Sequence, residues 1–258
     1  QLRLIRRRLH HLLAVHERQR DQPHHLHEPA SHGPLIRVVA VRQTEKHVEA
    51  LRAAMPHLRT ILITHRHSDH APATVPLKAA TGAEVIAPRN VLDDAIVDRR
   101  VSGGESLTIE GTRIDVIATP GHTNEHVCYL TSDGDLFTGD TILGTGTTAI
   151  FPPDGHMGDY FRSLQTLRAL EPRRIYPAHG PVRDDAVALI DEYIAHRLER
   201  EHQLLDAVAS RATTAAEMRA LIYPQLDERL HGAAEIQIEA HLIKLREEGR
   251  LIAGSPSE

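Results

Sequence analysis

The feature that most restricts the fold of this chain is the stretch ILITHRHSDH, residues 61–70. Its aliphatic and β-branched start predicts a short buried strand. His65, His67, Asp69 and His70 follow directly after that strand. Residues two apart in extended backbone point the same way, so His65 and His67 can face one metal ion together. The stretch therefore predicts a strand that ends in a cluster of potential metal ligands.

Further potential ligands follow other predicted strands. VIATPGHTNEH presents His122, LFTGDTILG presents Asp140 and RIYPAHG presents His179. Each lies beside Gly or Pro, where the backbone bends sharply and can approach a ligand closely. Together with the first cluster they supply nitrogen and oxygen donors but no thiolate. Such a set suits two divalent ions, for which zinc is the first choice and Mn²⁺ or Fe²⁺ remains compatible.

From Thr44 onward, the pattern of predicted elements is an alternation of strands and helices. SLTIEGTRIDVIATP and HVCYLTSDGDLFTGD predict hairpins that turn at their Glu-Gly and Asp-Gly pairs. RNVLDDAIV predicts a short helix, and a long helix follows the last strand. The final residues predict helix, helix and the short strand RLIAG, a pattern typical of a winged-helix module. We expect domains at 44–201 and 202–258, preceded by an irregular segment, 1–43.

Composition sets limits on the function. With 258 residues and 41% hydrophobic content the chain can bury a core, and its net charge of −5 does not favour nucleic-acid binding. No run of about 18 apolar residues predicts a membrane span. The single cysteine, Cys128, lies in an apolar run and is predicted to be buried. These features favour a cytoplasmic protein.

The ordered motifs T-H-x-H-x-D-H, T-P-G-H-T, G-D and a late H-G, over about residues 45–200, resemble the metallo-β-lactamase superfamily. The resemblance implies an α/β fold, a four-layer αββα sandwich, and a metal-dependent hydrolase. It implies that His65, His67 and His122 hold one metal and that Asp69, His70 and His179 hold a second, with Asp140 bridging them.

FTGDTILGTGTTAIF, IYPAHGPV and the winged-helix-like tail further resemble the β-lactamase-like protein 2 group. That likeness implies an endoribonuclease acting on single-stranded RNA. Residues 1–43 depart from the group, because the two strands expected there, with a G-T-N-T-like segment and a D-P-G loop, are missing. We hypothesise a reading-frame slip upstream of about Thr44, which the coding DNA would test. His24, His25 and His27 in this segment are more typical of an exposed stretch than of a metal site.

The expected reaction uses a hydroxide shared by two cations about 3.5–4 Å apart. Asp140 would hold the pair and Asp69 would orient the proton of the nucleophile. His126 is a candidate catalytic or supporting residue, although a core histidine is an equal alternative. The GTGTT loop, 144–148, and arginines such as Arg162 and Arg183 are candidate contacts for a phosphate.

Three functions remain open from the sequence. The first is a binuclear phosphodiesterase acting on single-stranded RNA, and the second is a glyoxalase II-like thioesterase acting on a small molecule. The third is a non-catalytic, metal-stabilised protein that binds nucleic acid. The region 202–258 carries six Arg or Lys against nine Asp or Glu, whereas a winged helix that reads DNA is normally basic. We interpret the tail as a lid, a homodimer surface or a scaffold for the substrate cleft.

Overall fold

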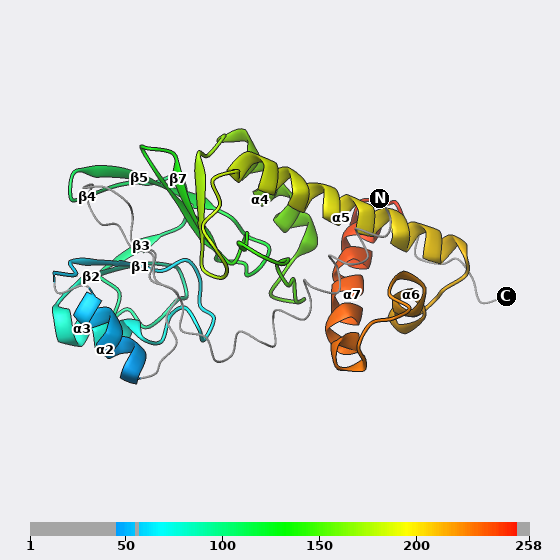
Figure 1. Ribbon diagram of the computed structural model, residues 1–258, viewed down its shortest axis with the longest axis horizontal. Helices are drawn as coiled ribbons and strands as arrows, with labels where there is room; N and C mark the ends of the chain where they lie inside the picture. Colours follow the sequence, from blue (N-terminus) through cyan, green and yellow to red (C-terminus); the bar gives the residue numbers. More distant parts are fainter. Residues whose placement is uncertain (1–44, 55–56, 252–258) are drawn as a thin grey trace.

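The structure, a computed structural model, describes residues 45–54 and 57–251. The predicted irregular segment 1–43, including its histidines, lies outside the described residues, as does Thr44. Figure 1 shows two β-sheets at one end of the molecule and a helical lobe, reached along the helix α5, at the other. In chain order the helices and strands are α2 Glu45–Ala54, β1 Thr60–Leu62, α3 Thr74–Thr81, β2 Glu84–Pro88, β3 Arg99–Val101, β4 Ser106–Ile109, β5 Thr112–Ala118, β6 Val127–Thr131, β7 Asp135–Gly139, α4 Met157–Ala169, β8 Arg174–Pro177, α5 Ala186–Ala209, α6 Ala215–Ile222, η2 Glu228–Leu230 and α7 His231–Glu247.

The strands form two sheets. The first has the order β1-β2-β3 with parallel pairing throughout. The second has the order β4-β5-β6-β7-β8; its first three pairings are antiparallel and the last is parallel. Both predicted hairpins are present, as β4–β5 and β6–β7. Glu110 and Gly111 carry the positive φ angles, 48° and 84°, that a tight hairpin turn requires.

Side chains alternate along each strand, and this alternation builds the layers. In β1, Ile61 packs with Leu77 of α3 on the outer side, while Leu62 packs with Ile114 of the second sheet on the inner side. Strands buried on both faces read as continuous hydrophobic runs, which is why residues 61–63, Ile-Leu-Ile, lack a polar position.

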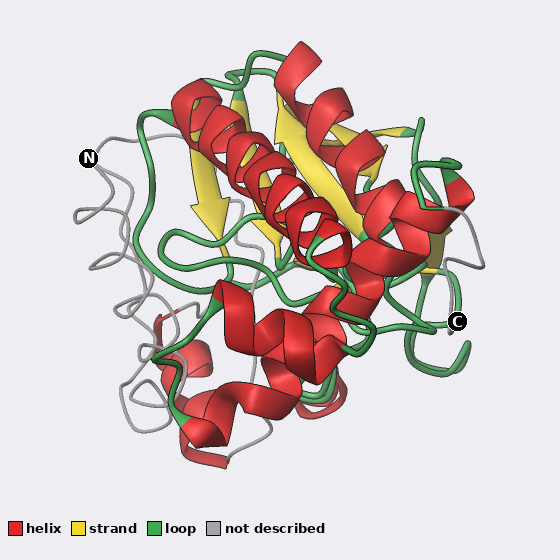
Figure 2. Ribbon diagram, turned by 90° about the vertical axis from the view of Figure 1, so that its right-hand side faces the viewer, coloured by secondary structure: helices red, strands yellow, loops and turns green. Residues whose placement is uncertain are grey.

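The second sheet repeats this arrangement. Tyr129 of β6 faces the core between the sheets, whereas the neighbouring Cys128 faces the core under α4 and α5. Figure 2 shows helices lying over the strands on this side. The result is a four-layer αββα sandwich, as expected, with Cys128 buried as predicted.

One local prediction was wrong, and a second concerns a segment of which the structure describes only the first two residues. No helix forms over residues 89–97, because Asn90 and Leu92 adopt left-handed φ angles of 63° and 59°. The Arg100 guanidinium fixes this loop by donating to the carbonyls of Pro88, Val91 and Leu92. The predicted strand RLIAG is not formed by Arg250 and Leu251, and its remaining residues are outside the described range.

The C-terminal lobe is joined to the sandwich by shared packing. Leu204 of α5, Met218 of α6 and Leu242 of α7 form a separate hydrophobic core, whereas Ala240 of α7 packs into the core under α4 and α5. The predicted boundary between residues 201 and 202 falls inside α5, which continues without a break. Within the described residues, no helix combines the length and the apolar character needed to cross a bilayer.

Candidate metal centre

The ligand-bearing loop leaves β1 and turns directly into α3. The Thr64 carbonyl accepts from the N–H of Val127 in the second sheet, at 3.0 Å, so the loop enters between the two sheets. The N–H groups of His70 and Ala71 donate to the His67 carbonyl and form the turn. This backbone directs the histidines inward, toward the ends of β5, β7 and β8.

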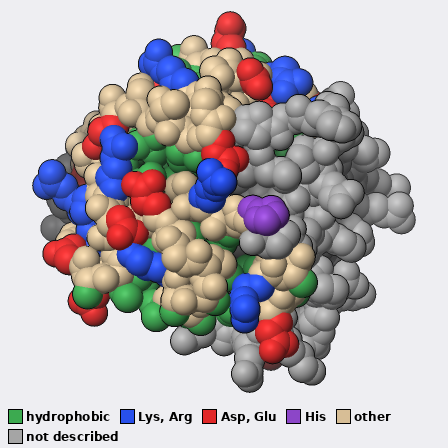
Figure 3. Space-filling view, turned by 90° about the vertical axis from the view of Figure 1, so that its left-hand side faces the viewer, with side chains coloured by type: hydrophobic (Ala, Val, Ile, Leu, Met, Phe, Trp, Pro, Cys, Tyr) green, Lys and Arg blue, Asp and Glu red, His purple; other side chains and the backbone are tan. Residues whose placement is uncertain are grey.

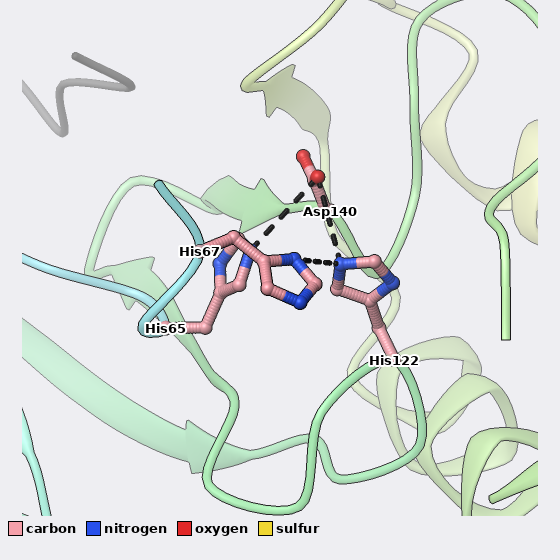
Figure 4. A group of neighbouring side chains, drawn as sticks. All are labelled: His65, His67, His122 and Asp140. Atoms are coloured by element: carbon pink, nitrogen blue, oxygen red, sulfur yellow. Dashed lines mark hydrogen bonds and ion pairs between the residues drawn. The ribbon is translucent and has the colours of Figure 1, made fainter. Parts of the chain in front are cut away.

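The first donor group consists of His65, His67, His122 and Asp140, whose ligand atoms all lie within 4.8 Å of one another. Figure 4 shows the three rings and the carboxylate converging on a common point. Nε2 of His122 lies 2.9 Å from Nδ1 of His67 and 3.6 Å from Oδ2 of Asp140. Tetrahedral zinc with bonds of about 2.0–2.1 Å places its ligand atoms about 3.3 Å apart, so this spacing suits such an ion.

The second donor group consists of Asp69, His70 and His179. Nε2 of His179 lies 3.3 Å from Oδ2 of Asp69, and Nε2 of His70 lies 3.7 Å from Oδ1 of the same carboxylate. Asp140 belongs to both groups by distance. Its Oδ2 lies 3.3 Å from Nε2 of His70, while its Oδ1 lies 3.4 Å from Nε2 of His179.

Buried atoms in the centre have no hydrogen-bond partner. They are Nε2 of His65, Nε2 of His70 and Oδ1 of Asp140. A buried polar atom without a partner costs free energy, and such atoms in native proteins usually indicate a role. All three belong to the donor groups, so bound cations would satisfy them. The donor set therefore fits divalent metal.

The electrostatics also suit a cation. Burial lowers the pKa of His65 well below its ordinary value, and the neighbouring His70 and His126 lower it further. Burial alone would raise the pKa of Asp140, but the nearby imidazoles, His70 foremost, hold it well below its usual range. A neutral imidazole and an ionised carboxylate are the forms that bind metal.

His126 supports the centre from inside the protein. Its Nε2 accepts from the Asp140 N–H at 3.3 Å, so the ring hydrogen must be on Nδ1, which lies 2.9 Å from Oγ1 of Thr119. Both ring nitrogens are therefore used by the protein, and the side chain is buried. This position agrees with a supporting role for His126 and not with contact to a substrate. A side chain at Gly139 would collide with this ring, since a Cβ there would lie 2.7 Å from Nε2.

Backbone contacts take up much of the GTGTT loop. The Gly144 N–H donates to the His179 carbonyl at 2.8 Å, so that group is not available to a phosphate. The hydroxyl of Tyr193 donates to the Gly146 carbonyl at 3.1 Å. The arginines named from the sequence also have partners, because Arg183 binds Asp185 through two nitrogens and Arg162 pairs with Asp159.

Sequence reasoning missed Arg66, which lies between two ligands in the chain. Its guanidinium lies 2.6 Å from both Glu125 Oε2 and Asp154 Oδ1, and its N–H donates to Glu125 Oε1 at 3.1 Å. It thereby ties the ligand loop to the loops that follow β5 and β7. The only sequence signal for this role was the position of Arg66 inside the H-x-H motif, because Glu125 and Asp154 are distant from it in the sequence.

Comparison with known proteins supports the same interpretation. Residues 39–179 match the metallo-beta-lactamase superfamily and residues 214–255 match the beta-lactamase associated winged helix domain. The first match begins inside the segment that was predicted to be irregular. A beta-lactamase-like protein 2 homolog from Drosophila melanogaster is 33% identical over 220 residues, covering 79% of this chain and 73% of the relative. A homolog of the same name from Caenorhabditis elegans is 35% identical, covering 62% and 56%.

Other relatives differ in name. An atrochrysone carboxyl ACP thioesterase from Cryptosporiopsis is 30% identical, covering 58% of this chain and 46% of its own length. Among solved structures, a beta-lactamase domain protein from Burkholderia ambifaria has a TM-score of 0.71 at 20% identity, covering 85% of this chain and 79% of the other. A metallo-beta-lactamase family protein from Thermus thermophilus has a TM-score of 0.67 at 23% identity, covering 85% and 87%. These two likenesses concern the fold.

The resemblance, the sandwich fold and the assignment as an enzyme are thus confirmed, and the structure brings all seven predicted ligands together. The chain belongs to the metallo-beta-lactamase superfamily of metal-dependent hydrolases and carries its associated winged-helix domain.

Proposed function

We propose that the protein is a binuclear hydrolase that cleaves phosphodiester bonds in single-stranded RNA, with zinc as its first-choice metal and Mn²⁺ or Fe²⁺ as alternatives. The shared position of Asp140 carries the binuclear part of this proposal. Its Oδ2 lies 3.6 Å from Nε2 of His122 in the first donor group, and its Oδ1 lies 3.4 Å from Nε2 of His179 in the second, an arrangement that would hold two ions as a pair. When bound, such ions supply Lewis acidity and lower the pKa of water.

The exposure of the ligands indicates the side from which a substrate approaches. The side chains of His65 and His70 are 0% and 2% exposed, whereas those of Asp69 and His179 are 35% and 21% exposed. The open side of the centre is therefore the Asp69–His179 side. There the Asp69 carboxylate can accept a proton from the attacking group and so orient it.

The case for RNA rests on the resemblance to the β-lactamase-like protein 2 group and on charge. A phosphodiester is an anion, and two bound divalent ions would outweigh the two carboxylates of the centre. The charge of the chain adds little attraction: the net charge is −5, and on the face that Figure 3 presents, basic and acidic side chains are interspersed without a continuous basic patch in the coloured part. We therefore expect few phosphate contacts and modest affinity for RNA.

The second candidate is a thioesterase, favoured by the relative named as an acyl carrier protein thioesterase. The same donor set can serve attack on a thioester carbonyl, so the ligands do not discriminate. Parallel assays with zinc or manganese, on single-stranded RNA and on a glutathione thioester, separate the two. We expect RNA cleavage. Turnover of the thioester without RNA cleavage under either metal would make the thioesterase the preferred function and contradict the assignment as a ribonuclease.

A further inference from the structure

The C-terminal lobe contacts a peptide group beside a predicted metal ligand. Nε2 of Gln237 in α7 donates to the Ile150 carbonyl at 2.7 Å, and the Ile150 N–H donates to Oε1 of Gln237 at 3.1 Å. The two contacts fix the orientation of the side-chain amide, because a carbonyl can only accept and an N–H can only donate. Gln237 therefore binds the backbone of Ile150 as a neighbouring strand would.

The peptide group that Gln237 holds is also the one that holds His122. The Ile150 N–H and the Ala149 carbonyl belong to the same planar peptide unit. The Ala149 carbonyl accepts from Nδ1 of His122 at 2.8 Å. A hydrogen-bond chain thus runs from Oε1 of Gln237, through this peptide unit, to the His122 ring.

This chain fixes both the tautomer and the direction of the ring. Because the Ala149 carbonyl is a hydrogen-bond acceptor, the ring hydrogen of neutral His122 must be on Nδ1. The lone pair is then on Nε2, on the side of the ring that faces the other potential metal ligands of the first group. A bond to one end of a peptide unit polarises the other end, so Gln237 also strengthens the acceptor that Nδ1 meets. Partners of this kind raise the basicity of a histidine ligand.

A second contact holds the neighbouring backbone from α5. The Arg197 guanidinium donates to the Thr148 carbonyl and to Oγ1 of Thr147, the latter at 3.0 Å. The hydroxyl of Thr148 in turn donates to the Asp140 carbonyl at 2.8 Å. Helices α5 and α7 thus together fix residues 147–150, and this segment connects the C-terminal lobe to the metal centre.

We propose that Gln237 is a positioning residue for His122, so that the winged-helix lobe completes the metal centre instead of serving only as a separate binding module. The inference rests on the metal centre of the proposed function and not on the identity of the substrate. Loss of the Gln237 amide frees the peptide unit to rotate, which weakens metal binding at the first donor group.

The test is zinc affinity, measured by chelator competition without any substrate. The variants are Gln237→Met, which keeps the length of the side chain, and Gln237→Ala. The matched control is Glu247→Met, on the same helix, which removes a different contact with the sandwich, the 2.9 Å hydrogen bond that Nε2 of His156 donates to the Glu247 carboxylate. Melting temperatures establish that each variant is folded.

We expect the Gln237 variants to bind zinc about 10-fold more weakly, the low end of the range for partners that orient a ligand, while Glu247→Met binds as the wild type does. Unchanged affinity in the Gln237 variants overturns the proposal, and so does an equal loss in the control, because that would indicate general loosening. A second measurement needs no variant: ring-nitrogen NMR of the metal-free protein should show the hydrogen of neutral His122 on Nδ1, and a hydrogen on Nε2 would also overturn the proposal. Failure of the wild type itself to bind metal would instead refute the proposed function.

Discussion

The backbone N–H of Asp140 donates a hydrogen bond to Nε2 of His126, across 3.3 Å. This bond holds the residue whose carboxylate faces both donor groups. The His126 ring is itself fixed by the threonine hydroxyls around Nδ1, at 2.9 and 3.1 Å. The position of the shared carboxylate thus depends on a buried histidine that does not reach the open side of the centre.

Replacing His126 by alanine should therefore impair metal binding without removing a ligand. The variant leaves the Asp140 N–H buried without a partner, at a cost of about 1–3 kcal/mol in the free energy of unfolding. We expect zinc affinity to fall about 10- to 100-fold. His202→Ala, at an exposed position of α5, is the control and should bind zinc normally. Wild-type affinity in His126→Ala would show that Asp140 needs no such support.

Arg66 should matter although it donates nothing to a metal. Arg66→Met removes both ion pairs that tie the ligand loop to Glu125 and Asp154. We expect weaker metal binding, by several-fold, together with a loss of thermal stability, because the Glu125 side chain is only 5% exposed and would lose its cationic partner. Arg59→Met is the control, because its side chain is 79% exposed and its nearest acid lies 4.0 Å away. Equal metal affinity in the two variants would contradict the positioning role.

Stability should depend on pH through His241 of α7. Burial lowers the pKa of this histidine to about 4. Below the ordinary pKa of about 6.5 the unfolded chain binds a proton that the folded chain does not, so stability falls as the pH drops from 6.5 toward 4. The full shift corresponds to about 3 kcal/mol, of which about 2 kcal/mol falls between pH 7 and pH 5. Urea unfolding of the metal-free protein measures the free energy of unfolding at pH 7 and at pH 5. His241→Gln should reduce the difference between these two free energies. An unchanged difference in that variant would assign the pH dependence to other groups.

RNA binding should weaken as salt rises, but only gently. Each phosphate contact with a single strand contributes about 0.7 to the log–log slope. Arg162, whose side chain is 68% exposed, is the candidate contact, although it pairs with Asp159. Arg162→Ala should lower the slope by about 0.7. The control is Arg113→Ala, which removes a comparably exposed arginine paired with Asp115. Identical slopes in the two variants would remove Arg162 from the interface.

The clustering of the potential ligands and the hairpins could be predicted because their signals are local. His65, His67, Asp69 and His70 are adjacent in the chain, and the Glu110–Gly111 turn carries its own conformational requirement. The helix expected around Asn90 failed because tertiary contacts from Arg100 override local propensity there.

The supporting contacts could not be predicted for a related reason. Gln237 and Ile150 are 87 residues apart in the chain, and Arg66 and Glu125 are 59 apart. No spacing rule links such pairs, since the fold alone brings them together. The roles of Asp69 and Asp140 in the reaction, and the substrate, stay predictions, because the ligand geometry suits more than one electrophile.

The number of divalent ions bound per chain tests the central claim most directly. Metal analysis of the protein saturated with zinc and then freed of excess ion should give close to two per chain, and His67→Ala should lose metal and turnover together. A wild-type value of one or less would contradict a centre in which Asp140 joins two donor groups. Full metal and full turnover in His67→Ala would contradict the assignment of the first group.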